Sequence, residues 1–166
     1  MQVEKIYTTK SYKETQKLGQ NFAREILALS LPKGENDSAA VLALCGNLGG
    51  GKTTFLQGFA KGLGIKEKIL SPTFVIIKKF KVSNRPVVKS TLSRTFHDRY
   101  FYHFDCYRIN NPEEILDLGF EKIISNPKNI VAIEWPEKIK KVLPKNIIKI
   151  DFKFINETKR EIFFKI

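Results

Sequence analysis

One octapeptide carries the residue types of a phosphate-binding site. Residues 46–53 read Gly-Asn-Leu-Gly-Gly-Gly-Lys-Thr and match the pattern G-x-x-x-x-G-K-[ST] in full. Glycines allow the backbone to wrap closely around an anion with its N–H groups pointing inward. Lys52 can reach the β- and γ-phosphates of a nucleotide as a catalytic residue, and the Thr53 hydroxyl can ligate Mg²⁺. The contacts predicted for this segment, the phosphate loop, come from Gly46, Asn47, Leu48, Gly49, Gly50, Gly51, Lys52, Thr53 and Thr54.

The sequence on both sides of the phosphate loop supports the same interpretation. Residues 40–45, Ala-Val-Leu-Ala-Leu-Cys, are continuously apolar, as in a strand that is buried on both faces. The residues after the loop predict a helix that ends near Gly64 and directs its positive dipole end at the phosphates. A chance glycine-rich turn before Lys-Thr is the alternative, and the agreement of strand, loop and helix disfavours it. Cys45 is expected to be a small buried hydrophobe.

The chain lacks the sequence pattern of a guanine-binding site. Such a site would place Asn/Thr-Lys-x-Asp after a later strand, and the nearest string, Pro127-Lys128-Asn129, has no acid. We therefore expect ATP, with Mg²⁺, as the nucleotide.

Two acids stand where a metal site next to a phosphate loop requires carboxylates. Asp105 ends the aromatic run 100–105, and Glu134 ends the apolar run 130–134. At the carboxyl ends of strands beside the phosphate loop, these side chains can hold Mg²⁺ or polarise the attacking water. A surface ion pair is the alternative for each: Asp105 with Arg108, and Glu134 with a lysine. His103, in the middle of its strand, is expected to be packed rather than catalytic.

The remaining pattern of the chain predicts an α/β domain. Ser11 can cap a helix that runs to about Leu31. Strands and helices intermix without repeats or linkers, so we expect one domain over residues 1–166, with a mixed, mostly parallel sheet flanked by helices and with antiparallel hairpins. The other predicted elements are strands at 3–8, 74–82, 100–106 and 130–135, a short helix from residue 111, and a hairpin of 147–155 with 161–166.

Composition restricts the class of protein. The 166 residues are 42% hydrophobic, and no apolar run approaches the roughly 20 residues of a membrane span. The N-terminus does not resemble a secretory signal, and the two cysteines, Cys45 and Cys106, imply no disulfide framework, so we expect a cytoplasmic protein. The net charge of +12 favours anionic partners, or it serves only solubility.

Several motifs together resemble the TsaE family (formerly YjeE), the small ATPases of bacterial tRNA threonylcarbamoyladenosine biosynthesis. They follow one another at compatible spacing over about residues 5 to 165. The combination is far more specific than the phosphate loop alone. The motifs are GNLGGGKTTFLQGFAKGLG, SPTF, YHFDCYR, PEEILDLGF and IEWPEK.

This resemblance implies roles for individual residues. The fold would be a P-loop NTPase domain that binds ATP and Mg²⁺, with Asp105 and Glu134 as the metal and hydrolysis residues. Ser71 and Thr73 would belong to a switch segment, in which Thr73 reads the γ-phosphate. Trp135 follows Glu134 as in the family and is either a core anchor or a lid beside the nucleotide. The resemblance also adds Lys138 and Arg160 as candidates for nucleotide contacts, and we count Ser11 among the candidates as well.

The resemblance also implies partners. Family proteins dock on the transferase pair TsaD and TsaB, reset that complex by ATP hydrolysis, and contact tRNA only through it. Alone they are slow ATPases, and we expect a monomer or a weak oligomer. Two features depart from the family: Asn47 replaces a frequent acid, and the connection 83–99 is long and basic. That connection is either a solvated loop or an added contact to tRNA or a partner.

Two other classes of function fit the phosphate loop. A small-molecule kinase would need an acceptor site and usually an arginine-bearing lid, and the only arginine-rich segment is 83–99. A nucleotide-sensing adaptor would use Asp105 and Glu134 as metal ligands without appreciable turnover.

Overall fold

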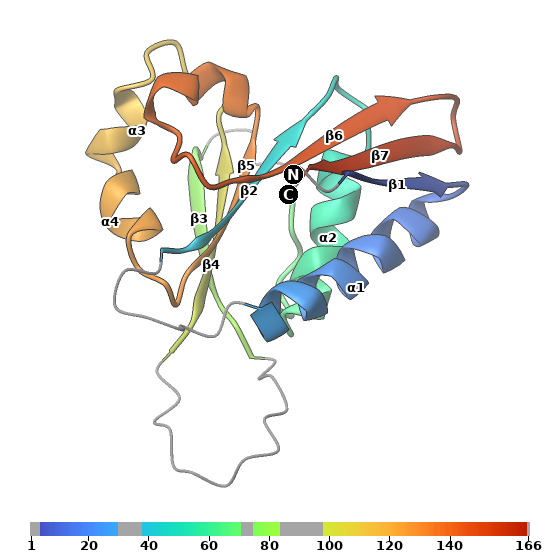
Figure 1. Cartoon of the computed structure of the whole chain (residues 1–166), viewed down its shortest axis with the longest axis horizontal. Helices are drawn as coiled ribbons and strands as arrows, with labels where there is room; N and C mark the ends of the chain where they lie inside the picture. Colours follow the sequence, from blue (N-terminus) through green and yellow to red (C-terminus); the bar gives the residue numbers. More distant parts are fainter. Residues whose placement is uncertain (1–3, 30–37, 71–74, 84–97, 166) are drawn as a thin grey trace, which may run out of the picture.

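The computed structural model describes residues 4–29, 38–70, 75–83 and 98–165. Its strands are β1 (Glu4–Thr9), β2 (Ala40–Cys45), β3 (Ile77–Lys81), β4 (Tyr100–Asp105), β5 (Ile130–Glu134), β6 (Ile148–Phe154) and β7 (Arg160–Lys165). Its helices are α1 (Tyr12–Leu29), α2 (Lys52–Gly62), α3 (Glu114–Asp117), α4 (Phe120–Ile124) and the 3-10 helix η1 (Pro136–Val142). The strands form one sheet in the order β1-β7-β6-β2-β5-β4-β3 (Figure 1).

The sheet is mixed, and its centre is parallel. Strand β2 pairs in parallel with β5 on one side and with β6 on the other, and β5 pairs in parallel with β4. The antiparallel partners lie outside this centre, where β7 pairs with β6 and β1, and β3 pairs with β4. The prediction of a mixed α/β sheet with antiparallel hairpins is therefore confirmed, and the parallel pairings form its centre.

Helices cover the sheet in two layers. Helices α1 and α2 lie on one face, and α3 and α4 lie on the other (Figure 1). Strand β2 supplies Leu42 and Leu44 to the core under α1 and α2, and Val41 to the core under α3 and α4. Both faces of this strand are thus buried, which is the physical reason for its continuous apolar sequence.

Helix α1 begins with the predicted cap. The Ser11 hydroxyl accepts a hydrogen bond from the Glu14 backbone N–H at 3.2 Å, and the Glu14 carboxylate accepts one from the Lys10 N–H at 2.7 Å. This exchange satisfies two donors at the helix start, much as in a capping box. The helix ends at Leu29, slightly before the predicted end, and residues 30–37 lie outside the described part.

The start of the basic connection is tied to the hairpin of β3 and β4. The Val82 N–H donates to the Arg99 carbonyl at 3.0 Å, and Lys81 pairs with Asp98 at 2.9 Å. Residues 84–97, which hold most of the predicted basic connection, lie outside the described residues, as do Ser71 and Thr73 of the predicted switch.

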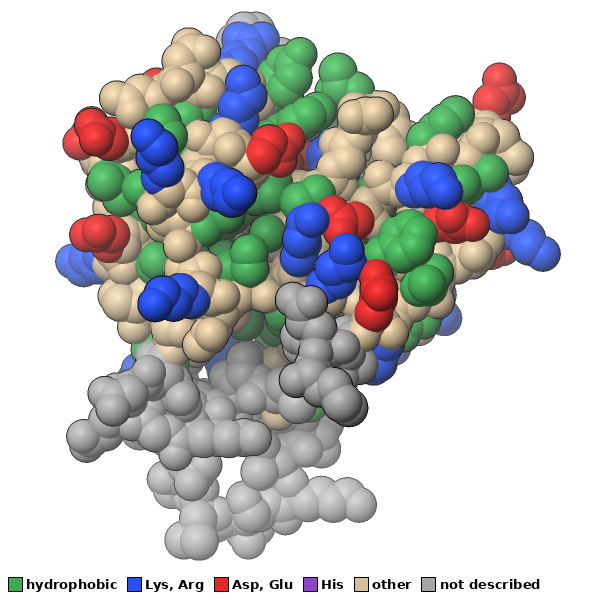
Figure 2. Space-filling model, turned by 45° about the horizontal axis from the view of Figure 1, so that its top comes forward, with side chains coloured by type: hydrophobic (Ala, Val, Ile, Leu, Met, Phe, Trp, Pro, Cys, Tyr) green, Lys and Arg blue, Asp and Glu red, His purple; other side chains and the backbone are tan. Residues whose placement is uncertain are grey.

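The described surface mixes both signs of charge. Figure 2 shows lysine and arginine side chains spread over the visible face with acidic side chains among them. Within the described residues, no helix has the length and hydropathy needed to cross a membrane.

Glycines permit a close crossing of α1 and α2. A Cβ at Gly58 would overlap the backbone carbonyl of Gln16, and one at Gly19 would overlap that of Phe55. A Cβ at Gly62 would lie 2.6 Å from the Cβ of Ala23. The two helices therefore meet backbone to backbone, without a layer of side chains between them.

This crossing makes Gly58→Ala a test of the packing. Helix propensity alone predicts stabilisation by about 1 kcal/mol. We expect instead a loss of about 1–3 kcal/mol, because the new methyl must push α1 away. Thermal unfolding measures the difference, with the exposed Lys61→Ala in the same helix as the control. A rise in melting temperature for Gly58→Ala would contradict this account of the crossing.

Candidate functional site

The phosphate loop has the backbone conformation that its glycines predict. Gly46, Gly49 and Gly51 have φ angles of 131°, 74° and 102°, in the region that favours glycine. Gly46 also passes close to β6, because a Cβ there would lie 2.5 Å from the Phe152 carbonyl oxygen. At Gly49 a Cβ would meet no atom within 4 Å. The loop is therefore fixed against the sheet at its start and open near its middle.

Lys52 is buried inside this loop. Its ammonium donates hydrogen bonds to the backbone carbonyls of Gly46 and, at 3.1 Å, Asn47. It also lies 4.2 Å from the centre of the Trp135 ring. Burial lowers the pKa of Lys52, and the nearby carboxylates, Glu134 foremost, act in the opposite direction. A phosphate would offer this ammonium a charged acceptor in place of neutral carbonyl oxygens.

The sheet register brings the two predicted acids side by side. Asp105 and Glu134 are direct partners in the parallel pairing of β4 with β5, and both end their strands. Both residues are buried. The two strand ends thus present neighbouring carboxylates beside the start of α2.

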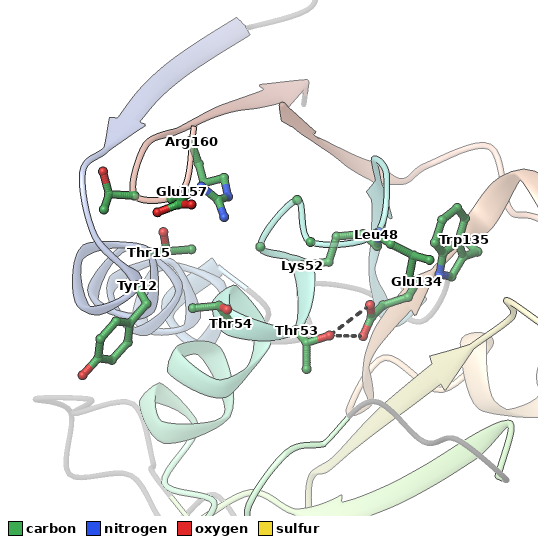
Figure 3. Close-up of a pocket in the computed structure, with 14 residues that line it drawn as sticks. Tyr12, Thr15, Leu48, Lys52, Thr53, Thr54, Glu134, Trp135, Glu157 and Arg160 are labelled. Atoms are coloured by element: carbon green, nitrogen blue, oxygen red, sulfur yellow. Dashed lines mark hydrogen bonds between the residues drawn. The ribbon is translucent and has the colours of Figure 1, made fainter. Parts of the chain in front are cut away.

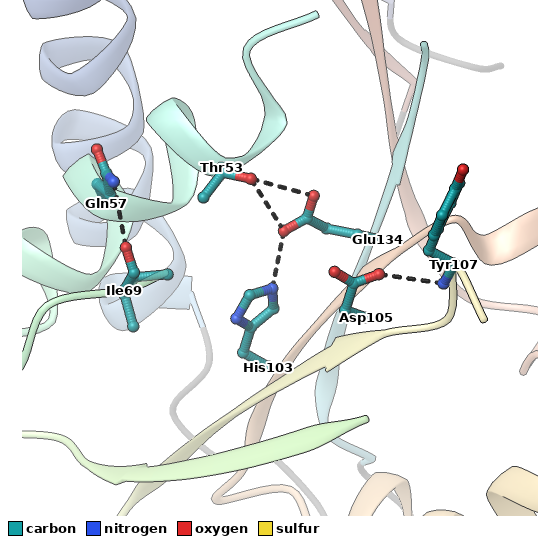
Figure 4. Close-up of polar contacts among 7 residues, drawn as sticks. All are labelled: Thr53, Gln57, Ile69, His103, Asp105, Tyr107 and Glu134. Atoms are coloured by element: carbon teal, nitrogen blue, oxygen red, sulfur yellow. Dashed lines mark hydrogen bonds and ion pairs between the residues drawn. The ribbon is translucent and has the colours of Figure 1, made fainter. Parts of the chain in front are cut away.

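Glu134 faces the first turn of α2 (Figures 3 and 4). Its carboxylate oxygens lie 3.5 and 3.4 Å from the Thr53 hydroxyl, longer than the usual 2.5–3.0 Å of a strong hydroxyl hydrogen bond. Oxygen atoms at this spacing suit a hard cation, and Mg²⁺ usually takes one or two carboxylates plus phosphate oxygens and water. Among the described residues no cluster of three metal-binding side chains occurs. Thr53 and Glu134 are the residues here whose oxygen atoms could hold such a cation.

Asp105 is fixed by the turn that follows its strand. Its carboxylate accepts a hydrogen bond from the Tyr107 backbone N–H at 3.1 Å. The Tyr107 ring in turn lies 5.1 Å from the ring of Trp135. The predicted roles of Asp105, as a metal residue or as an ion-pair partner of Arg108, both stay predictions.

Trp135 follows Glu134 directly, and its ring lies between Tyr107 and Lys52 of the phosphate loop. Its φ of 60° is the one positive value among non-glycine residues in the described part of the chain. Such a conformation costs free energy and persists where the surroundings enforce it. The ring packs against the core under α3 and α4 and also lines the pocket above Lys52. The ring therefore packs as a core anchor on one side, and its predicted role as a lid beside the nucleotide stays a prediction.

A pocket of about 250 Å³ runs along the outside of the phosphate loop (Figure 3). Glu134 and Trp135 lie at one end, and Tyr12, Thr15 and Arg160 lie at the other. The lining residues are Tyr12, Thr15, Leu48, Gly49, Gly50, Gly51, Lys52, Thr53, Thr54, Glu134, Trp135, Glu157, Thr158 and Arg160.

The pocket brings together most of the predicted site residues. Among the described residues, the predicted ones that it does not include are Gly46, Asn47, Asp105, Ser11 and Lys138. Gly46 and Asn47 hold Lys52 instead, and the Ser11 hydroxyl caps α1. Lys138 is exposed on η1, so its contact with a nucleotide stays a prediction.

Sequence reasoning missed the pocket end formed by α1 and the β6–β7 turn. Tyr12, Thr15, Glu157 and Thr158 line it, and no motif marked them. Arg160, which was predicted, lies there with its guanidinium 4.5 Å from the Phe154 ring. Only the antiparallel pairing of β7 with β6 and β1 brings these segments together, and a sequence pattern does not specify that pairing.

A glutamine one turn after Thr53 is a second missed residue. The Gln57 side chain accepts a hydrogen bond from the Gln16 amide at 3.0 Å and donates one to the Ile69 carbonyl at 3.1 Å (Figure 4). Gln57 thereby joins α1 to the chain just before the predicted switch residue Ser71.

The cysteines are not candidates for nucleophiles. Burial raises the pKa of the Cys45 thiol to about 11 and that of Cys106 to about 12. Both thiols are protonated at neutral pH. Cys45 is only half-buried, so the expectation of a small buried hydrophobe holds there only in part.

Strand, loop and helix together define a mixed α/β protein with a Walker A phosphate loop. Comparison with known proteins specifies the family. The family model "Threonylcarbamoyl adenosine biosynthesis protein TsaE" matches residues 9–162, and the chain belongs to this TsaE family.

Individual relatives agree with this assignment. The chain is 35% identical over 156 residues to the Rickettsia conorii tRNA threonylcarbamoyladenosine biosynthesis protein TsaE, covering 93% of this chain and 74% of that protein. It is 37% identical over 124 residues to the Bacillus subtilis protein of the same name, covering 75% of this chain and 68% of that protein. The crystal structure of Bacillus subtilis YdiB matches with a TM-score of 0.69 and 28% identity, over 99% of this chain and 86% of that one.

The position of Trp135 makes nucleotide binding observable. It is the only tryptophan of the chain, and its ring lies over Lys52. We expect ATP to change the tryptophan fluorescence in a saturable way, because the phosphates draw the ammonium away from the indole. AMP, which lacks the β- and γ-phosphates, should cause a smaller change. Lys52→Ala should abolish the ATP response, and an unaltered response in that variant would separate the signal from the loop.

Proposed function

We propose that this protein binds ATP with Mg²⁺ and hydrolyses it in support of threonylcarbamoyladenosine modification of tRNA. One observation carries the proposal: Glu134 lies 3.4–3.5 Å from the Thr53 hydroxyl, inside the pocket that the phosphate loop lines. A carboxylate in this position can serve both the metal and the attacking water. Membership of the TsaE family supports the biological role.

The pocket suggests how the nucleotide is held. The open backbone near Gly49 and the start of α2 would bind the β- and γ-phosphates, with Lys52 compensating their charge. The base and sugar would extend toward Tyr12, Thr15 and Arg160 at the other end of the pocket. Bound Mg²⁺ would neutralise charge that develops on the phosphate oxygens.

The chain's own residues would divide the hydrolysis step. Glu134 would orient the attacking water and accept its proton, while Lys52 stabilises charge on the transferring phosphoryl group. Thr53 would hold the metal, and Asp105 would support it from the neighbouring strand. Trp135 would exclude bulk water from the Lys52 side of the pocket.

The proposal includes the setting in which the protein works. We expect a single-domain cytoplasmic protein that is a monomer or weak oligomer alone. It would act on a TsaD and TsaB complex, meet tRNA through that complex, and reset it for turnover by ATP hydrolysis.

Phosphate release from ATP tests this function directly. We expect slow release by the protein alone and faster release with TsaD and TsaB. Glu134→Ala should reduce turnover about 10²–10⁴-fold, the usual loss for a positioned acid or base, while ATP binding changes little. Glu137→Ala, an exposed acid on η1, is the matched control and should retain activity.

Other outcomes identify the competing classes of function. Stoichiometric phosphorylation of a small-molecule acceptor would indicate a kinase. Binding without release, even with both partners, would indicate a nucleotide-sensing adaptor. Equal loss of binding and hydrolysis in Glu134→Ala would make Glu134 chiefly a metal-site residue.

Asp105→Asn distinguishes a metal role from a structural ion pair. If Asp105 supports Mg²⁺, the concentration of Mg²⁺ needed for half-maximal ATP binding should rise about 10-fold or more. ATP titrations at several Mg²⁺ concentrations measure this shift, with the exposed Asp117→Asn as control. An unchanged Mg²⁺ dependence, together with equal destabilisation by Asp105→Asn and Arg108→Gln, would favour the ion pair.

A further inference from the structure

We propose that His103 is the positioning residue for Glu134: its Nε2–H donates to Glu134 Oε1 and holds the carboxylate in its orientation beside Thr53. The inference deepens the proposed function, because it assigns the group that aims the hydrolytic carboxylate. The sequence had suggested only that His103 is packed. It is indeed fully buried, and it also contacts the acid of the site (Figure 4).

Strand geometry brings the histidine to the acid. On β4, His103 precedes Asp105 by two residues, so both side chains point to the face that α2 covers. In the parallel register His103 is paired with Ala132, two residues before Glu134 on β5. Diagonal neighbours on one face are within reach of long side chains. The contact thus follows from the same register that brings Asp105 beside Glu134.

The hydrogen bond with His103 is the shortest of the described contacts of the Glu134 carboxylate. His103 Nε2 lies 2.9 Å from Oε1, whereas the Thr53 hydroxyl lies 3.4 Å or more from either oxygen. The terminal torsion of a glutamate is broad, so a carboxylate without a fixed donor can rotate. One firm donor on Oε1 therefore determines where Oε2 points.

The surroundings of His103 define its tautomer. Glu134, when ionised, only accepts hydrogen bonds, so Nε2 must carry the proton. Nδ1 is buried and has no hydrogen-bond partner among the described residues. A second proton there would be an unsatisfied buried donor, which is costly. The neutral Nε2–H form is the one that fits.

A pair of amide substitutions tests the role. The Gln amide nitrogen reaches roughly as far as His Nε2, whereas the Asn amide nitrogen reaches only as far as Nδ1. His103→Gln can keep the donor to Glu134, and His103→Asn removes it while burying the same chemical group. The two variants therefore differ in reach rather than in polarity, and their melting temperatures show whether both fold.

Steady-state ATP hydrolysis with the TsaD and TsaB partners gives the first measurement. We expect His103→Asn to lower kcat about 10–100-fold, as for other residues that orient a functional carboxylate, with KM for ATP within about twofold. His103→Gln should recover most of kcat. In the Glu134→Ala background, His103→Asn should cause no further loss, because the two residues act as one unit. Equal and near-native kcat for the Asn and Gln variants would overturn the proposal.

Imidazole nitrogen spectra give a measurement that does not depend on activity. The chain has two histidines, His97 and His103, so ¹⁵N-histidine labelling with a His97→Gln variant assigns the signals. We expect the neutral Nε2–H tautomer for His103 and a change in its Nε2 signal in Glu134→Gln. A dominant Nδ1–H tautomer, or a signal that is insensitive to Glu134→Gln, would contradict the contact.

The two measurements separate failure of the inference from failure of the proposed function. If the unaltered protein releases no phosphate with its partners, the proposed hydrolysis is wrong, and the spectra still decide whether His103 holds Glu134. If hydrolysis occurs and the spectra show the Nε2–H contact, but His103→Asn retains full kcat, the positioning role is wrong while the function stands.

Discussion

The parallel register of β2, β5 and β4 is the constraint on which the site depends. Pairing of β2 with β5 brings Glu134 to the level of Leu44, next to the start of the phosphate loop. Pairing of β5 with β4 then brings Asp105 beside Glu134. A slip of one residue in either pairing would turn an acid to the opposite face, toward the core under α3 and α4. Every residue of β5 is buried, so a slip of this central strand would place its acid in the core.

The same register also brings the buried charged side chains of the site close together. The protein as a whole carries a charge of +12, yet its buried site combines one lysine with two carboxylates. Lys52 donates hydrogen bonds to the loop carbonyls, Glu134 accepts one from His103, and Asp105 accepts one from the Tyr107 N–H. Each buried charge thus has a fixed partner of its own, which limits the cost of desolvation. The net charge of the surface says little about the site.

The sequence predicted those parts that depend on local pattern. The phosphate loop, the strand before it, the helix after it and the acids at two strand ends follow from short motifs and from burial periodicity. The role of His103 could have been predicted in part, because it shares a face with Asp105. Its contact with Glu134 could not, since that depends on the register between two strands separated by 24 residues along the chain.

The end of the pocket near Arg160 was less accessible to sequence reasoning. Thr15 lies on α1, Thr158 lies in the turn between β6 and β7, and their proximity depends on how distant segments pair. Ser11 illustrates the limit: a serine before a helix fits both a cap and a ligand contact, and the structure uses its hydroxyl for the cap. The predicted switch, Ser71 and Thr73, lies outside the described residues.

The glycine crossing of α1 and α2 has a mechanical consequence. One wall of the pocket, Tyr12 and Thr15, belongs to α1, while Lys52 and Thr53 begin α2. At Gly19 and Gly58 the backbones are in direct contact. No layer of side chains lies between the helices there that could rearrange and let one helix slide along the other. The pocket wall on α1 and the pocket wall on α2 are therefore held together rigidly. If the pocket changes shape during a nucleotide cycle, we expect the movement at the opposite wall, which carries Glu134 and Trp135.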